Sequence, residues 1–164
     1  MSVFKGNNMT RILAVLLGLG TPAMAGPDQD KVLACFAEMG FSTTWNQCLN
    51  TMFASCAEHE IGSPDHLACL TQARSEWQQA KIDAETGVLE VLTETGFEEL
   101  SGLMLAWPKF VEDKCEVVAA SRSDISAEAA RLGCHISEFA LLTNEFTACL
   151  NGRSTEAYCQ LKAQ

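Results

Sequence analysis

Residues 56–94, CAEHEIGSPDHLACLTQARSEWQQAKIDAETGVLEVLTE, carry a long helical pattern. Ser63 and Pro64 suit the capping and first-turn positions of a helix, while Ile61 and Gly62 end the segment before it. The stretch therefore predicts a turn followed by a long helix over residues 64–94. Its apolar residues recur at the spacing of one helix face, namely Leu67, Leu70, Ala73, Trp77, Ala80, Ala84, Val88 and Val91.

Helical patterns also occur on both sides of this helix, and no segment alternates apolar and polar residues as a strand does. Thr95-Gly96 is expected to break the chain before the next helix, and Asn151-Gly152 before the last one. The sequence predicts an all-α fold, a disulfide-stapled antiparallel bundle of about five or six helices. The further helices are expected over residues 27–39, about 45–60, 97–120, 126–150 and 154–161.

The helix expected over residues 97–120 contains a proline. Pro108 removes a backbone donor and clashes with the preceding turn, so we expect a kink or a restart near Ala106-Trp107. The apolar side that should face the core consists of Leu100, Leu103, Met104, Trp107, Phe110, Val111, Val117 and Val118.

The first 25 residues have the features of an export signal. Lys5 and Arg11 precede an apolar run over residues 12–19, and Ala23-Met24-Ala25 matches a signal peptidase site. The run is shorter than the roughly 20 residues that span a bilayer, although a membrane anchor or an amphipathic helix is the alternative. We expect cleavage after Ala25, a single domain over residues 26–164, and a periplasmic or secreted protein without a membrane span.

The chain is strongly acidic, with 21 Asp and Glu against 11 Lys and Arg, a net charge of −10. Because Lys5 and Arg11 are the charged residues of the signal, its removal changes the net charge to −12. Such a surface repels nucleic acid and anionic lipid and attracts basic proteins. Solubility alone is the other explanation for this composition.

All eight cysteines lie beyond residue 25, and an even number in an exported chain indicates disulfides. Helix hairpins bring together residues at similar distances from a turn, and the cysteines flank four turns in this way. The first and last pairs could exchange partners if the terminal segment packs on the first helices. The expected bonds are Cys35–Cys48, Cys56–Cys69, Cys115–Cys134 and Cys149–Cys159.

Zinc is a competing explanation for one pair, because Cys56, His59, His66 and Cys69 together form a two-Cys, two-His set. In an oxidising compartment we expect the disulfide instead. No phosphate loop, nucleophile elbow or zinc-protease motif occurs, and the three histidines have no triad spacing. We therefore expect no enzyme activity, no cofactor and no metal.

The segment from Trp107 onward resembles the family of lysozyme inhibitor LprI-like N-terminal domains, whose signature has the form Trp-x-x-aromatic-Arg-Asp-x-x-Cys. Val111 stands where the signature has arginine, and Leu142 lies near the place of a second family arginine. We expect apolar packing at both positions. The matching residues are Trp107, Phe110, Glu112 in the acidic position, Cys115, and Cys134 at the head of the next helix.

The resemblance implies an envelope-facing helical domain that binds a protein and, in the founding member, inhibits lysozyme. An inhibitor needs a group that covers or enters the substrate cleft. The expected contacts are two turns, His59 to Asp65 and Ser121 to Ser126, the second including Asp124. The alternative is a structural or interaction module of the bacterial envelope with no enzyme target.

Overall fold

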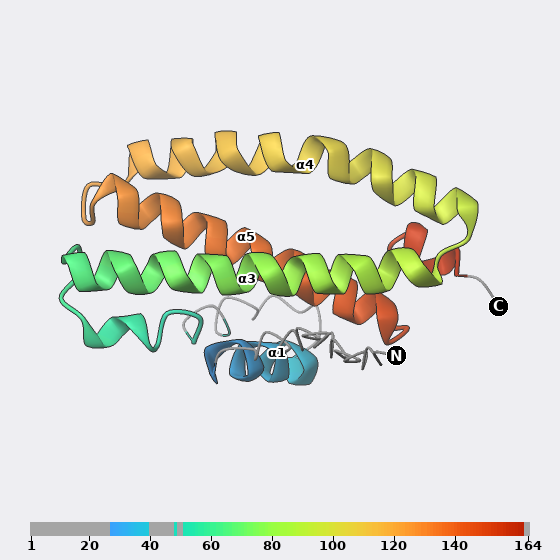
Figure 1. The fold of residues 1–164 in the computed structure, drawn as a ribbon, viewed down its shortest axis with the longest axis horizontal. Helices are drawn as coiled ribbons and strands as arrows, with labels where there is room; N and C mark the ends of the chain where they lie inside the picture. The colour runs from blue at the N-terminus through green and yellow to red at the C-terminus, as the bar shows by residue number, and fades with distance from the viewer. Residues whose placement is uncertain (1–26, 40–47, 49–50, 163–164) are drawn as a thin grey trace, which may run out of the picture.

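The computed structural model describes residues 27–39, 48 and 51–162, and this part of the chain is helical (Figure 1). It contains α1 (Pro27–Met39), α3 (Pro64–Val91), α4 (Glu94–Ser121) and α5 (Ala127–Leu150), with 3-10 helices η1 (Cys56–Glu58) and η2 (Tyr158–Gln160). The described residues form no strand, only an isolated bridge between Leu92 and Lys162. The all-α prediction is confirmed, whereas the expected count of five or six helices is not.

Helix α5 is the centre of the fold, because α3 and α4 both pack against it (Figure 1). One buried cluster joins α1, α3 and α5 through Phe36, Trp77 and Ile136, each at most 2% exposed. A second cluster, which includes Leu100 and Phe146, lies where α4 begins and α5 ends. The two clusters hold the helices at opposite ends of a long bundle.

Four disulfides staple this bundle, and they are the pairs expected from the turns. The Cα atoms of each pair lie 5.3–5.7 Å apart, within the range that a disulfide requires. Cys56 and Cys69 are bonded to each other, so their thiolates are not available to zinc. The bonds are Cys35–Cys48, Cys56–Cys69, Cys115–Cys134 and Cys149–Cys159.

The boundary between α3 and α4 lies earlier than the sequence indicated. The chain turns at Leu92 and Thr93, and Thr93 caps α4 by accepting a hydrogen bond from the Gly96 amide at 3.3 Å. Gly96 lies inside the first turn of α4, where a Cβ atom would stand 3.0 Å from the Leu161 side chain. The glycine therefore permits a close approach of the C-terminal segment, and is not a helix break.

Helix α4 departs from expectation on its apolar side. It runs through Pro108 without a restart, and Figure 1 shows it bowed along its length. Leu103, Phe110 and Val117, expected in the core, are 60%, 58% and 69% exposed. These three residues lie seven positions apart, along one edge of the apolar side, and α5 does not cover that edge.

Two shorter expectations are corrected or lie outside the described residues. The helix expected over residues 154–161 is reduced to η2, a single 3-10 turn. Of the helix expected over about 45–60, residues 45–47, 49 and 50 are outside the described part, and the rest contains turns and η1. The expected signal peptide also lies outside the described residues.

Within the described ranges no helix combines the length and the apolar character needed to cross a membrane.

Candidate functional site

The first of the two turns proposed as partner contacts is rigidly built. Gly62 has a φ of +82°, a left-handed conformation that favours glycine. Its amide donates to Nδ1 of His66 at 3.2 Å, and the amide of His66 donates to the Ser63 hydroxyl at 3.1 Å. These bonds leave Ile61 at the tip of the turn with 67% of its surface exposed. His59 and Asp65 are exposed on either side of it.

The second turn is held by an ion pair and by a helix cap. Arg122 donates two hydrogen bonds of 2.6 Å to the carboxylate of Asp124, and this pairing lowers the pKa of Asp124 to about 2. Ser126 caps α5 by accepting from the Ala129 amide at 3.2 Å. Ser121 is exposed, and its hydroxyl donates to the Val118 carbonyl at 2.9 Å.

Both turns line one cavity of about 400 Å³ at the same end of the bundle. Ile61 reaches it from the first turn, His66 from the start of α3, and Arg122 and Ile125 from the second turn. The predicted contact residues do not line it themselves, namely His59, Asp65, Ser121 and Asp124. The structure thus brings together two turns that lie about sixty residues apart and that the sequence predicted separately as partner contacts. The rest of the lining is mostly apolar, from Phe53, Leu70, Val118, Ala129, Ala130, Gly133 and Cys134, with Ser137 and Glu138 as polar neighbours.

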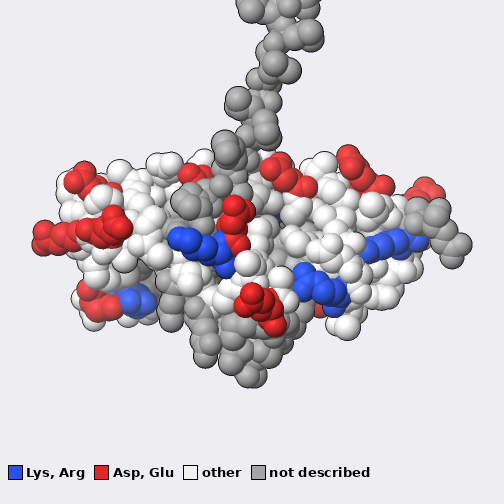
Figure 2. All heavy atoms as spheres, turned by 90° about the horizontal axis from the view of Figure 1, so that it is seen from below, with Lys and Arg blue, Asp and Glu red and all other residues white. Residues whose placement is uncertain are grey.

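Carboxylates outnumber basic groups in the two turn segments that reach this end cavity. Figure 2 shows acidic groups beside one basic group at the left end of the molecule, the end that carries the two turns in Figure 1, and further acidic groups along the rest of that face. Residues 58–66 and 121–128 include one Lys or Arg, namely Arg122, which is paired with Asp124. An apolar opening with an acidic rim suits a basic partner that offers an apolar side chain. The carboxylates are Glu58, Glu60, Asp65, Asp124 and Glu128, all exposed.

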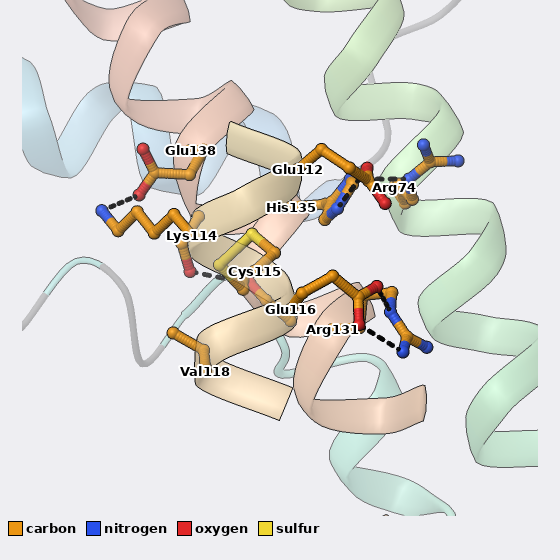
Figure 3. Close-up of a disulfide and its surroundings, with 12 residues drawn as sticks. Arg74, Glu112, Lys114, Cys115, Glu116, Val118, Arg131, His135 and Glu138 are labelled. Atoms are coloured by element: carbon orange, nitrogen blue, oxygen red, sulfur yellow. Dashed lines mark hydrogen bonds and ion pairs between the residues drawn. A yellow bond between two sulfur atoms is a disulfide. The ribbon is translucent and has the colours of Figure 1, made fainter. Parts of the chain in front are cut away.

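Two disulfides fix the arms of these turns. Cys56–Cys69 closes the first turn, and Cys115–Cys134 closes the second at the point shown in Figure 3. Two ion pairs beside the second bond also join α4 to α5, Lys114 with Glu138 and Glu116 with Arg131 (Figure 3). Covalent and ionic links therefore hold the end cavity in one shape.

Three residues of the family signature lie close to a buried histidine. Trp107 packs on Phe139 with 5.7 Å between ring centroids, and Glu112 Oε2 lies 3.4 Å from His135 Nε2. Cys115 forms its bond to Cys134, the residue before His135. Phe110 lies at the surface, with 58% of its side chain exposed. The signature segment thus anchors α4 to α5, apart from that one ring.

His135 is a feature that the sequence did not single out. It is 6% exposed and lines a hollow of about 230 Å³ that Arg74, Trp107 and Glu112 also line. Arg74 Nε donates to its Nδ1 at 3.3 Å, while Nε2 faces Glu112 and has no hydrogen-bond partner among the described residues (Figure 3). Burial, and secondarily the charge of Arg74, lower the pKa of His135. The one available hint was a histidine on the inner face of an apolar helix.

Apolar packing occupies the two positions where the resembling family has arginine. Val111 is 2% exposed, and Leu142 packs against the cluster that contains Phe146.

Comparison with known proteins adds no assignment to this geometry. No family model, no curated protein and no solved structure matches the chain.

Proposed function

We propose that this protein is a periplasmic binding domain that acts by binding a basic protein and not by catalysis. The proposed partner is a lysozyme-type enzyme that attacks the cell envelope, and the proposed contact surface is the end cavity with its two turns. The observation that carries the proposal is the convergence of these turns on one apolar opening with an acidic rim.

The shape of the turn end suits insertion into an enzyme's substrate cleft. Ile61 projects from a turn whose backbone is fixed by the bonds of Gly62 and Ser63. A fixed loop loses little conformational entropy when it binds, so more of its contact energy appears as affinity. The nearby cavity offers a place for an apolar side chain of the partner.

Charge supports the choice of a basic partner. The mature chain carries a net charge of −12, because removing Lys5 and Arg11 takes the total from −10 to −12. Opposite charge speeds diffusional encounter, and the effect weakens as salt is added. Lysozymes are commonly basic, and the resemblance of the Trp107 to Cys134 segment to lysozyme-inhibitor domains points to the same class.

Location in an oxidising compartment is supported by the four disulfides and by the export signal expected over residues 1–25. Bacterial periplasm combines this redox state with a need for protection against envelope-degrading enzymes. We therefore place the mature chain, residues 26–164, on that side of the inner membrane.

The turn surface is tested by replacing Ile61 with alanine in oxidised residues 26–164 and measuring inhibition of the lysozyme that the parent protein inhibits best. Because Ile61 is mostly exposed, I61A should leave the fold intact and weaken inhibition by about tenfold. Leu105→Ala is the matched control, since Leu105 is 85% exposed on α4 and does not line the end cavity.

A second variant tests the polar part of both turns. Alanine at His59, Asp65, Ser121 and Asp124 removes the proposed contacts without touching the cavity floor. Loss of inhibition with an unchanged circular dichroism spectrum supports the proposal. Unchanged inhibition in this variant and in I61A overturns it. An envelope partner captured by a protein that inhibits no lysozyme would favour the structural module.

A further inference from the structure

Helix α4 exposes an apolar surface that the bundle does not use. Of its 28 residues only five are buried, and Leu103 and Phe110 are 60% and 58% exposed. These two lie seven positions apart, which places them on the same side of a helix. Large apolar groups arranged in this way are typical of a contact surface.

The surface continues into a groove of about 440 Å³ between α4 and α5. From Leu100 to Phe110 the α4 lining covers about 15 Å, at 1.5 Å per residue. An apolar groove of this kind is the type of site into which an amphipathic helix lays its apolar face. The lining consists of Leu100, Leu103, Met104, Ala106, Trp107, Phe110, Leu142, Glu145, Phe146 and Tyr158.

One carboxylate lies in this apolar groove. Glu145 accepts a hydrogen bond from the Tyr158 hydroxyl, and burial raises the pKa of Glu145, with the charge of Glu156 acting in the same direction. A cationic group placed in the groove would stabilise the ionised form of Glu145. An anionic group would meet the opposite effect.

The charges along α4 favour the same sign of ligand. Glu94, Glu98 and Glu99 are exposed, and residues 94–108 contain no Lys or Arg. The two lysines that follow are already paired, Lys109 with Asp113 and Lys114 with Glu138. By its position around α4, Glu99 lies on the groove side with Leu103 and Phe110, whereas Glu94 and Glu98 lie on the opposite side. Two lysines near the groove rings are paired with carboxylates: Lys81, 5.3 Å from the Trp107 ring centroid, with Glu85, and Lys114, 6.0 Å from the Phe110 ring centroid, with Glu138. A ligand of this groove therefore meets the carboxylates of Glu99 and Glu145.

We propose that the groove between α4 and α5 binds the apolar face of a basic amphipathic helix presented by a partner protein. A second copy of this chain would bring the same carboxylates to the contact, so charge opposes it. The site goes beyond the proposed function, because the groove shares no lining residue with the end cavity.

The test uses oxidised residues 26–164 and a synthetic peptide of about 14 residues, four helical turns, built from leucine and lysine in amphipathic order. A peptide with glutamate in place of every lysine has the same apolar face and the opposite charge. Trp107 lines the groove, so its fluorescence reports occupancy. Only the lysine peptide should bind with a saturable fluorescence change.

Variants locate the binding. Phe110→Ser should lower the affinity for the lysine peptide by about tenfold. Leu105→Ser, the control on the same helix, should leave this affinity unchanged. Glu145→Gln should reduce the difference in affinity between the lysine peptide and the glutamate peptide. Glu90→Gln on the exposed side of α3 should not change that preference. Circular dichroism checks that each variant folds.

Several outcomes would overturn the proposal. These are equal binding of the two peptides, binding that survives Phe110→Ser, or no binding by a folded protein. Self-association that Phe110→Ser abolishes would assign the surface to a second copy instead. Lysozyme inhibition is measured on the same Phe110→Ser protein and should persist, so failure of the groove leaves the turn proposal intact.

Discussion

His135 Nε2 lies 3.4 Å from Glu112 Oε2, while its Nδ1 accepts a hydrogen bond from Arg74. One imidazole thus connects α3, α4 and α5 between an arginine and a carboxylate. An arginine donating to Nδ1 favours the neutral ring with its proton on Nε2, directed toward Glu112. The contact is a structural junction of the three long helices.

This junction predicts a pH dependence of stability. Burial lowers the pKa of folded His135 below its ordinary value of 6.5, so the unfolded chain binds a proton first as the pH falls. The contribution of His135 to the free energy of unfolding should therefore be lost progressively below pH 6.5. Urea unfolding of the wild type and His135→Gln at pH 7.5 and 5.5 measures this. A wild-type advantage that stays constant between the two pH values would contradict it.

Removing the carboxylate should shift the same titration. Glu112 raises the pKa of His135 and partly offsets burial, so Glu112→Gln should lower that pKa further. The imidazole resonances in a proton NMR titration give the value directly. Asp113→Asn is the control, because Asp113 pairs with Lys109. An unchanged pKa in Glu112→Gln would show that the carboxylate does not act on the ring.

The disulfides should contribute similarly to stability despite their different loops. Replacing both cysteines of the Cys115–Cys134 bond by alanine should cost about 3 kcal/mol of unfolding free energy. The same change at Cys149–Cys159 should differ by less than about 1 kcal/mol, because loop entropy grows with the logarithm of length. The sequence separations are 19 and 10 residues, and chemical denaturation compares the variants. A much larger difference between the two losses of unfolding free energy would show that native contacts, and not loop closure, determine the effect.

Two glycines of α4 should respond oppositely to alanine. A Cβ atom at Gly102 meets nothing within 4 Å, so Gly102→Ala should stabilise the helix by about 0.5–1 kcal/mol. At Gly96 it would lie 3.1 Å from the Leu161 carbonyl oxygen, and Gly96→Ala should cost about 1–3 kcal/mol. Thermal unfolding of both proteins gives the two signs, and stabilisation by Gly96→Ala would contradict the packing described here.

Local chemistry explains which features were predictable from the sequence. Turns place flanking cysteines side by side, so the pairs of Cys56 and Cys115 could be expected once a turn was predicted between the two cysteines of each pair. The start of α4 did not, because Gly96 reads as a break until the approach of Leu161 is known. The choice between Thr93 and Gly96 as the turn depends on a tertiary contact.

The candidate sites depend on packing even more strongly. Phe110 belongs to an apolar set wide enough to face α5 or solvent, and only the placement of α4 decides between them. His135 acquires its role from Arg74 and Glu112, which lie on two other helices. Each of the two turns could be predicted as a contact from the sequence, but the cavity that they share forms only when α3 packs against α5.

Titration of oxidised residues 26–164 against a panel of lysozymes, at low and at moderate salt, tests the central claim most directly. We predict sub-micromolar inhibition of at least one basic lysozyme, weaker at the higher salt because screening reduces the attraction. Absence of binding to every lysozyme in the panel would contradict the proposed function.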